Sequence, residues 1–413
     1  MTVREVDRSL LLAVTLVTIP GLATLYSAGQ ADFPTVASGI WMRQVLWLIL
    51  GGLGAAFAFR FSPRVVEWIT PYAFVTAIIL LVATLFFGTG AGTAAGSKSW
   101  LSIGSIRIGQ PAEFAKLATA LMLARHLGAK RESPRTLAEL IPAGAIVFVP
   151  FVLIGLQPDL GSALVLVGIL FAMLYWVGVN VWLLLLLASP MISLFLAFST
   201  GLWGAWIVAI TLLLFWLRPY VTEALVVWSG NVAMGVIALG VWNRLADYQK
   251  NRILSFLNPE VDPQAAGWNV IQSKVAIGSG GVFGTGFLEG SQKRLAFLPA
   301  QHTDFIFSIV GEEFGFLGVA VSLLLFAFLL FVLLRIAATA VDSFSSLMVA
   351  GITGMLFVHI VENVGMTIGM LPVTGIPLPF FSYGGSFALI CLFSIGLVLR
   401  TAWETRYGGY AEG

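Results

Sequence analysis

Charge is scarce in this sequence: Asp, Glu, Lys and Arg make up only 10% of its 413 residues, and histidine occurs three times. Soluble domains carry about 25% charged residues, so this composition excludes an ordinary soluble globular protein. The one cysteine, Cys391, excludes an internal disulfide. A net charge of +2 is too small to indicate a nucleic-acid partner. The sequence also lacks a His/Cys metal spacing, a G-x-S-x-G elbow and an H-E-x-x-H motif.

Apolar residues are correspondingly abundant. They make up 59% of the chain, and the mean hydropathy is +0.96. These values predict an all-α, polytopic integral membrane protein. A bilayer core needs about 20 apolar residues per helix. By that length the sequence predicts about 12 transmembrane helices, near residues 9–27, 40–59, 65–87, 112–128, 140–156, 160–178, 181–198, 201–217, 221–243, 312–337, 344–369 and 384–401.

The distribution of Lys and Arg among the connections predicts the orientation, because these residues are retained on the cytoplasmic side. With the N-terminus inside, the inner connections and tails carry Arg4, Arg8, Arg60, Arg64, Arg125, Lys130, Arg131, Arg135, Arg218, Arg335, Arg400 and Arg406. The short outer connections and their flanks carry only Arg43, Lys98, Arg107 and Lys116. We therefore expect both termini in the cytoplasm and the segment 244–311 outside. This sidedness also holds if 181–198 and 201–217 form a re-entrant feature.

The first outer segment, from Gly88 to Leu121, reads as an amphipathic surface segment that ends in a helix start with two charged residues. Pro111 suits a first helical turn, where its missing N–H is no loss. Glu113 and Lys116 are three residues apart and so share one helix face. Ionisable groups at membrane depth usually face a cavity or a partner. The pair therefore predicts a site lining or a buried ion pair that fixes two helices, and the two readings are compatible.

The second outer segment, 244–311, is long for a connection without a function. It contains a helix-like stretch, WNVIQSKVAIG, followed by glycines at 278, 280, 281, 284, 286 and 290. Glycines bring backbone N–H groups close to phosphate, but without a G-K-[ST] motif we favour a pliant loop. Lys274, Lys293 and Arg294 add positive charge that suits an anionic headgroup or a pyrophosphate.

Two aspartates lie at predicted helix starts. We interpret Asp159, in LQPDLGSA, as a helix N-cap. Asp304 stands beside His302 where the outer segment meets the bilayer, so its carboxylate can contact water and lipid headgroups together. An N-cap for the helix that begins near Phe305 is equally consistent. From the residues alone, the protein has an outward-facing cavity with acidic and basic groups, and both a transporter and a lipid-processing enzyme remain open.

Five motifs then occur in one order along the chain: GSKSWLSIGSIRIGQPAEFAK, QPDLGSA, NPEVDP, IQSKVAIGSGGVFGTGFLEGSQKRLAFLPAQHTDFIFSIVGEEFGFLG and GMLPVTGIPLPFFSYGGS. Together they resemble the SEDS family (shape, elongation, division and sporulation), and QSKVAIGSGG resembles its RodA-like elongation branch. The resemblance extends from about Arg4 to Arg406. Members of this family usually have ten transmembrane helices. The chain is therefore expected to be one membrane domain, 1–413, with an extra helix pair within 181–243.

The resemblance implies a peptidoglycan glycosyltransferase that polymerises lipid II on the outer face of the bacterial cytoplasmic membrane. Asp304, of the H-T-D-F motif, matches the general base of an inverting transfer. The leaving pyrophosphate needs cations, for which Lys116, Arg43, Lys274 and Arg294 are candidates. Lys116 has the best support, since it falls with Glu113 on the family's Q-P-x-E-x-x-K motif. The other residues expected to line the cavity are Gln110, Asp159, His302, Thr303, Ser382 and Tyr383.

A pyrophosphate brings negative charge close to Asp304, so we expect Mg²⁺ or Mn²⁺ to assist the reaction. The ion would bind through oxygen ligands and phosphate. The resemblance also implies membrane lipids, the elongation machinery and a class B penicillin-binding protein as partners. A lipid II flippase that uses the same cavity is the alternative function, and a scaffold for the transpeptidase comes third. A flippase favours a pathway into the cytoplasmic half, where His359 and Glu362, on one face of 344–369, are the exceptions to an outward clustering of ionisable residues.

Overall fold

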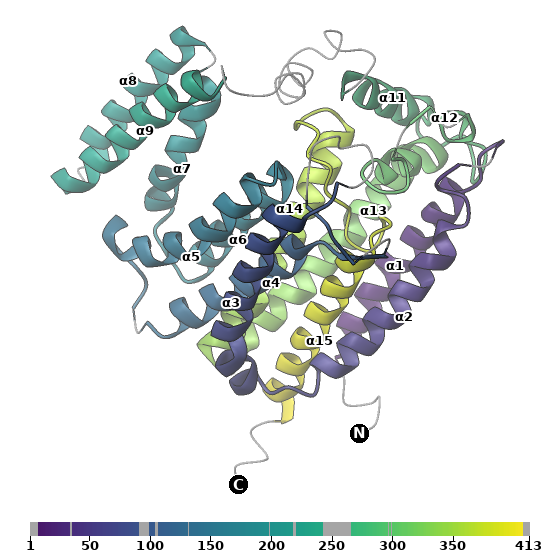
Figure 1. Cartoon of the computed structure of the whole chain (residues 1–413), viewed down its shortest axis with the longest axis horizontal. Helices are drawn as coiled ribbons and strands as arrows, with labels where there is room; N and C mark the ends of the chain where they lie inside the picture. Colours follow the sequence, from purple (N-terminus) through teal and green to yellow (C-terminus); the bar gives the residue numbers. More distant parts are fainter. Residues whose placement is uncertain are drawn as a thin grey trace.

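The computed structural model describes residues 7–33, 35–90, 99–103, 106–130, 132–197, 199–217, 220–242, 266–295, 297–298 and 300–407. Each of the twelve ranges predicted to cross the membrane contains a helix. These helices are α1 (Arg8–Ala28), α2 (Ile40–Ala58), α3 (Pro63–Phe87), α4 (Pro111–Gly128), α5 (Leu137–Gly155), α6 (Leu160–Trp176), α7 (Val181–Leu196), α8 (Thr200–Leu217), α9 (Val221–Trp242), α13 (Ile306–Thr339), α14 (Ser343–Thr367) and α15 (Gly385–Tyr407). Figure 1 shows them as one bundle with a projecting group, α7 to α9.

Nine of the described helices are long and apolar enough to cross a membrane: α1, α2, α3, α5, α8, α9, α13, α14 and α15. The helices α6 and α7 are apolar but shorter, and α4 carries three charged residues, Glu113, Lys116 and Arg125. The protein is therefore an all-α multi-pass membrane protein. A count of twelve crossings stays a prediction.

The described parts of the two predicted outer segments contain short elements of their own. In the first, β1 (Leu101–Ile103) pairs antiparallel with β2 (Ile106–Gly109) just ahead of α4. In the second, the helix-like stretch is α11 (Ala266–Ser279), followed by the short α12 (Ser291–Arg294). Lys98, Arg218, residues 244–265 and the NPEVDP motif within them lie outside the described residues.

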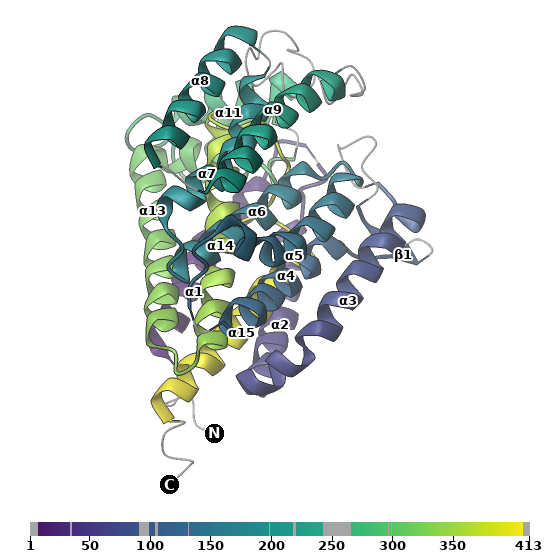
Figure 2. The same ribbon diagram turned by 90° about the vertical axis from the view of Figure 1, so that its left-hand side faces the viewer.

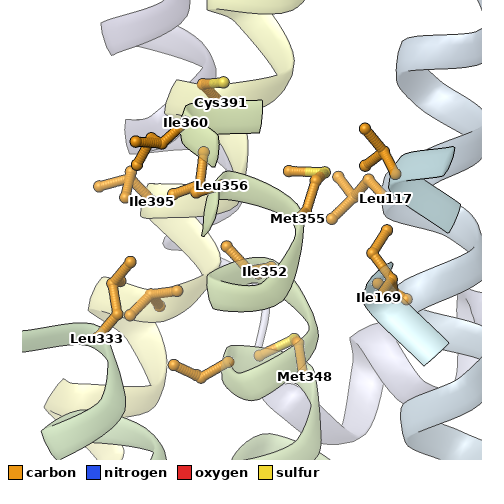
Figure 3. Packing of buried hydrophobic residues seen from close by; sticks show 14 of the residues in the cluster. Leu117, Ile169, Leu333, Met348, Ile352, Met355, Leu356, Ile360, Cys391 and Ile395 are labelled. Atoms are coloured by element: carbon orange, nitrogen blue, oxygen red, sulfur yellow. The ribbon is translucent and has the colours of Figure 1, made fainter. Parts of the chain in front are cut away.

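Helix α14 lies at the centre of the bundle and is the most buried of the nine candidate spans. It packs against α4, α6 and α13. Figure 3 shows Ile352, Met355 and Leu356 of α14 between Leu117 of α4 and Ile395 of α15. A polar side chain on α14 is therefore surrounded by protein and must find its partners there.

Helix α4 is buried along most of its length, and many of its buried side chains are small. Ala112, Ala115, Ala118, Ala120 and Ala124 are all fully buried. Small residues let helix backbones approach closely in a membrane bundle, and α4 packs against α3, α5, α6 and α14. This close approach brings the charged first turns of α4 against α14.

The range predicted to hold an extra helix pair, 181–243, contains the three helices α7, α8 and α9. They have their own small core of Leu186, Ile210, Leu214 and Val227. Figure 1 shows them side by side and apart from the central helices. Glu223 of α9 accepts from the backbone N–H of Leu137 at 2.8 Å, which joins this unit to the start of α5.

At the end of the bundle where α1 begins, Asp7 joins three helices. Its carboxylate caps α1 through the N–H of Leu10 at 3.1 Å. It also pairs with Arg335 of α13 at 3.0 Å and Arg406 of α15 at 2.7 Å. The longest helix, α13, thus runs along one edge of the molecule (Figure 2) from the Asp304 turn to this cluster.

Candidate active site

Residues 300–305 form a tight turn that presents Asp304 just before α13. The N–H groups of Thr303 and Phe305 both donate to the carbonyl of Ala300, at 3.0 and 3.4 Å. Helix α13 begins at Ile306, its N-cap position is Phe305, and no side chain caps it there. The structure thus assigns the N-cap position to the residue that follows Asp304.

The segment before α15 holds this turn from one side. Ser382 donates its hydroxyl to the carbonyl of Thr303 at 2.5 Å and accepts from the N–H of Leu378 at 2.8 Å. The N–H of Tyr383 donates to the carbonyl of His302 at 2.9 Å. Four residues predicted to line the site, His302, Thr303, Ser382 and Tyr383, are therefore brought together. Burial lowers the pKa of His302 below its usual value, so this imidazole is neutral at pH 7.

Helix α14 holds the turn from the other side. Asn363 donates its side-chain amide to the carbonyl of Asp304 at 2.9 Å and to that of Ile376 at 2.8 Å. This places residues 374–377 beside the turn. Gly375 within them is exposed and has a φ of +75°, and a Cβ there would lie 3.4 Å from Asp304 Oδ2. A side chain at position 375 would therefore lie beside the carboxylate of Asp304.

The predicted pair of Glu113 and Lys116 is formed and fully enclosed. Lys116 Nζ lies 2.8 Å from Glu113 Oε2, and neither side chain is more than 4% exposed. The ammonium also lies 2.9 Å from Nε2 of His359 on α14. The ion pair lies within α4, and the contact of Lys116 with His359 joins α4 to α14. A direct contact between Lys116 and a substrate stays a prediction.

Gln110 and Asp159 extend this cluster toward α6. Asp159 Oδ1 accepts from the N–H of Ser162 at 3.1 Å, so the predicted N-cap is confirmed. Its other oxygen, Oδ2, accepts from the side-chain amide of Gln110 at 2.7 Å. Gln110 precedes the first residue of α4, and this bond ties the starts of α4 and α6 together.

Three polar residues of α14 complete the site: His359, Glu362 and Asn363 are all buried. Glu362 Oε2 makes no hydrogen bond with any described residue. His359 and Glu362 were noted from the sequence as exceptions to the outward clustering of ionisable residues, whereas Asn363 was missed. The structure instead places all three at the end of α14 that faces Asp304. The available signal was the polar pattern H-x-x-E-N inside an apolar span.

The remaining basic candidates have other neighbours. Arg294 pairs with Asp32 at 3.0 Å on the surface, where both side chains are about half exposed. Lys274 is exposed and lies against Gly369 just past the end of α14. Arg43 is exposed on α2. The next residue, Gln44, is buried and bonds to the carbonyl of Ser382 at 3.4 Å, so the residue of α2 that contacts the site was missed.

The glycine-rich stretch packs against α13. Helix α13 is broken at Gly315, whose φ is +62°. The N–H groups of Thr285 and Gly286 donate to the carbonyls of Glu312 and Glu313 across this break, at 2.9 and 3.1 Å. A Cβ on Gly284 would overlap the carbonyl of Glu313. Gly280 and Gly284 therefore lack side chains where the backbone of the stretch packs against the backbone of α13.

A buried ion pair fastens the same stretch to the bundle. Lys293 of α12 lies 2.5 Å from Glu313 of α13, and both side chains are fully buried. The hydroxyl of Ser27, on α1, donates to Glu313 at 2.5 Å and accepts from Lys293 at 2.8 Å. Glu312 accepts from the N–H of Gln292 at 2.8 Å. Lys293 is thus a structural anchor here and not a free cation for a ligand.

Comparison with known proteins identifies the family. The model of the FtsW, RodA and SpoVE family, described as "Cell cycle protein", matches residues 7–203 and 195–407. The chain belongs to this family. The predicted SEDS membership, with its RodA-like character, is confirmed.

Named relatives match this member of the family over almost its full length. It is 36% identical to the "Peptidoglycan glycosyltransferase RodA" of Treponema pallidum, with 96% of this chain and 97% of the relative covered. It is 33% identical to the "Peptidoglycan glycosyltransferase MrdB" of Escherichia coli K12, with 96% and 93% covered. "Stage V sporulation protein E" of Bacillus subtilis is 34% identical, with 98% and 100% covered.

Solved structures agree with the fold. A chain from "Structural coordination of polymerization and crosslinking by a peptidoglycan synthase complex" matches with a TM-score of 0.71 and 27% identity, covering 97% of this chain and 98% of that one. The rod shape determining protein RodA of Thermus thermophilus matches with a TM-score of 0.62 and 26% identity, with 97% of each chain covered.

Proposed function

We propose that this protein polymerises lipid II into β-1,4 glycan strands on the outer face of the bacterial cytoplasmic membrane during cell elongation, with Asp304 as the general base. The enzyme class is peptidoglycan glycosyltransferase, the name carried by relatives at 33% and 36% identity over 96% of the chain. The choice of Asp304 as the base rests on the geometry of the site.

The observation that carries the proposal is the way Asp304 is held. Its turn is bonded to the segment before α15 through Ser382 and to α14 through Asn363, both at 2.9 Å or less. Its Oδ2 lies beside the exposed Gly375. A base must be fixed in place and within reach of the substrate, and the contacts that hold this turn support that role for Asp304.

The reaction assigns one step to this carboxylate. In an inverting transfer the sugar hydroxyl of the acceptor attacks the anomeric carbon of the donor from the face opposite the pyrophosphate. The new C–O bond forms as the bond to the pyrophosphate breaks, and Asp304 takes the hydroxyl proton. The leaving group departs with its negative charge, which cations must stabilise.

The residues of the site supply only some of the ligands that a divalent cation needs. Carboxylate oxygens such as those of Asp304 and Glu362 are the donors that Mg²⁺ and Mn²⁺ prefer. Among the described residues no group of three or more His, Cys, Asp or Glu side chains is placed to hold a metal ion. We therefore expect the ion to bind mainly through the pyrophosphate. When bound, it would neutralise charge on the leaving group.

The proposal extends to the partners of the protein and to its orientation in the membrane. We propose a class B penicillin-binding protein as the partner, supported by the likeness to a chain of a peptidoglycan synthase complex. Membrane lipids and the elongation machinery complete the expected surroundings. We also propose that both termini face the cytoplasm and that Asp304 faces outward. The basic Arg335 and Arg406 at the opposite end of the bundle from the Asp304 turn support this orientation.

The test is polymerisation of labelled lipid II by the purified protein in liposomes, with and without the partner, for the parent chain and the Asp304→Asn variant. Glycan products from the parent and none from the variant support the proposal. Translocation of lipid II by both proteins, with no polymer from either, would establish the flippase instead.

A further inference from the structure

A chain of polar contacts runs from α4 through α14 to the wall of the site. Lys116 Nζ lies 2.9 Å from Nε2 of His359, and Nδ1 of the same ring lies 3.1 Å from the carbonyl oxygen of Pro377. His359 is fully buried, so these two contacts are the environment of its ring nitrogens. The imidazole therefore joins the buried ion pair to residues 374–377.

The chemistry of the two partners fixes the tautomer of His359. A carbonyl oxygen only accepts, so the hydrogen must lie on Nδ1. An ammonium only donates, so Nε2 must present its lone pair to Lys116. The ring is thus neutral and oriented, with the two nitrogens in distinct roles.

The plane of the ring is fixed as well. His359 stacks on Phe387 of α15, with ring centroids 4.5 Å apart and an angle of 27° between the planes. Lys116 Nζ lies 5.7 Å from the centroid of the same phenyl ring. Phe387 therefore supports both members of the contact, and the imidazole has one orientation that satisfies all its neighbours.

One turn further along α14, Asn363 bonds to the carbonyls of Ile376 and Asp304. Helix α14 thus bonds to two successive carbonyls, those of Ile376 and Pro377. These two residues directly follow Gly375, which lies against Asp304 Oδ2. We propose that His359 is a positioning residue that couples the buried Lys116–Glu113 pair to the segment 374–377 and so fixes the wall against which Asp304 works. This inference rests on the proposed role of Asp304.

The tautomer supplies a test that does not depend on activity. The chain has only three histidines, so ¹⁵N-imidazole labelling gives few signals, and the His359→Gln variant assigns the one that disappears. At neutral pH we expect a neutral ring with the proton on Nδ1. We expect Lys116→Met to change this signal, because Nε2 loses its donor. A proton on Nε2, or a signal that Lys116→Met leaves unchanged, would overturn the coupling.

Two substitutions separate positioning from mere packing. His359→Gln keeps one donor and one acceptor, whereas His359→Phe keeps an aromatic ring on Phe387 but removes both hydrogen bonds. We expect His359→Gln to polymerise within about threefold of the parent. We expect His359→Phe to lose at least about tenfold in kcat with KM nearly unchanged, since the residue does not touch substrate.

The matched control is His126→Phe, in the last turn of α4, which should leave kcat unchanged. Full activity of His359→Phe would refute the inference. So would equal loss in both His359 variants when His359→Gln keeps the parental unfolding temperature. If the parent itself forms no glycan, the proposed function fails, and the imidazole spectra still decide whether His359 links Lys116 to Pro377.

Discussion

Asn363 and Asp304 are joined by a hydrogen bond of 2.9 Å from the amide of the first to the backbone carbonyl of the second, across 59 positions of sequence. The bond is made to the backbone of Asp304 and not to its carboxylate. The most buried candidate span thereby sets the position of the proposed base.

Asp304→Asn should abolish polymerisation while the protein remains inserted and folded. The amide keeps the shape of the side chain but does not accept the proton, and a general base typically contributes about 10²- to 10⁴-fold. Initial rates of glycan formation measure the effect, with the unfolding temperature in detergent as the control. Normal polymer yield would remove Asp304 from the base role.

Lys116→Met should destabilise the protein by about 3–5 kcal/mol, because it leaves the carboxylate of Glu113 buried without its cation. Adding Glu113→Gln should recover most of that loss, and a double-mutant cycle in unfolding measurements gives the coupling. The charge-swapped pair should recover less, since a carboxylate at 116 would face the lone pair of His359. Additive single effects would argue against a coupled pair.

Gly284→Ala should lower stability by more than about 1 kcal/mol, because φ there is +85° and the new Cβ would overlap the carbonyl of Glu313. Gly278→Ala is the matched control in the same stretch: it lies in α11 with no atom within 4 Å of the added carbon. It should be neutral or stabilising. Equal unfolding temperatures for the two variants would contradict the packing role of Gly284.

Exhaustive chelation should reduce polymerisation at least tenfold, and Mg²⁺ or Mn²⁺ should restore it. The unfolding temperature of the chelated protein should not change, because the described residues contain no preformed metal cage. Undiminished glycan synthesis in EDTA would show that basic side chains alone stabilise the leaving pyrophosphate.

Asp7→Asn should destabilise the protein at neutral pH but not at low pH. Burial alone would raise the pKa of Asp7, but hydrogen bonds from Ser9 and Leu10 and the charges of Arg406 and Arg335 outweigh it and lower the pKa below the usual 3.8. A lowered carboxyl pKa gives stability that is present above the unfolded value and lost as pH falls through the folded one. Unfolding temperatures of the two proteins should therefore converge below about pH 4, and a constant difference down to pH 3 would refute this.

The helices and the turn of Asp304 could be predicted from the sequence because their signals are local. Apolar length located the helices, and the H-T-D-F motif located the turn. The choice between Arg43 and Gln44 could not be made, since neighbouring positions on a helix point about 100° apart and only packing shows which one is buried. The contact of Ser27 with Lys293, 266 positions apart, could not be predicted from the local sequence around either residue.

The break at Gly315 has a consequence for local opening. The carbonyls of Glu312 and Glu313 bond to the loop at Thr285 and Gly286, and the N–H groups of Phe316 and Leu317 bond to Gly281 and Val282. These amides cannot exchange with solvent deuterium unless the loop separates from α13. The amides of Thr285, Gly286, Phe316 and Leu317 should therefore exchange together, as one cooperative unit distinct from the inner turns of the helix.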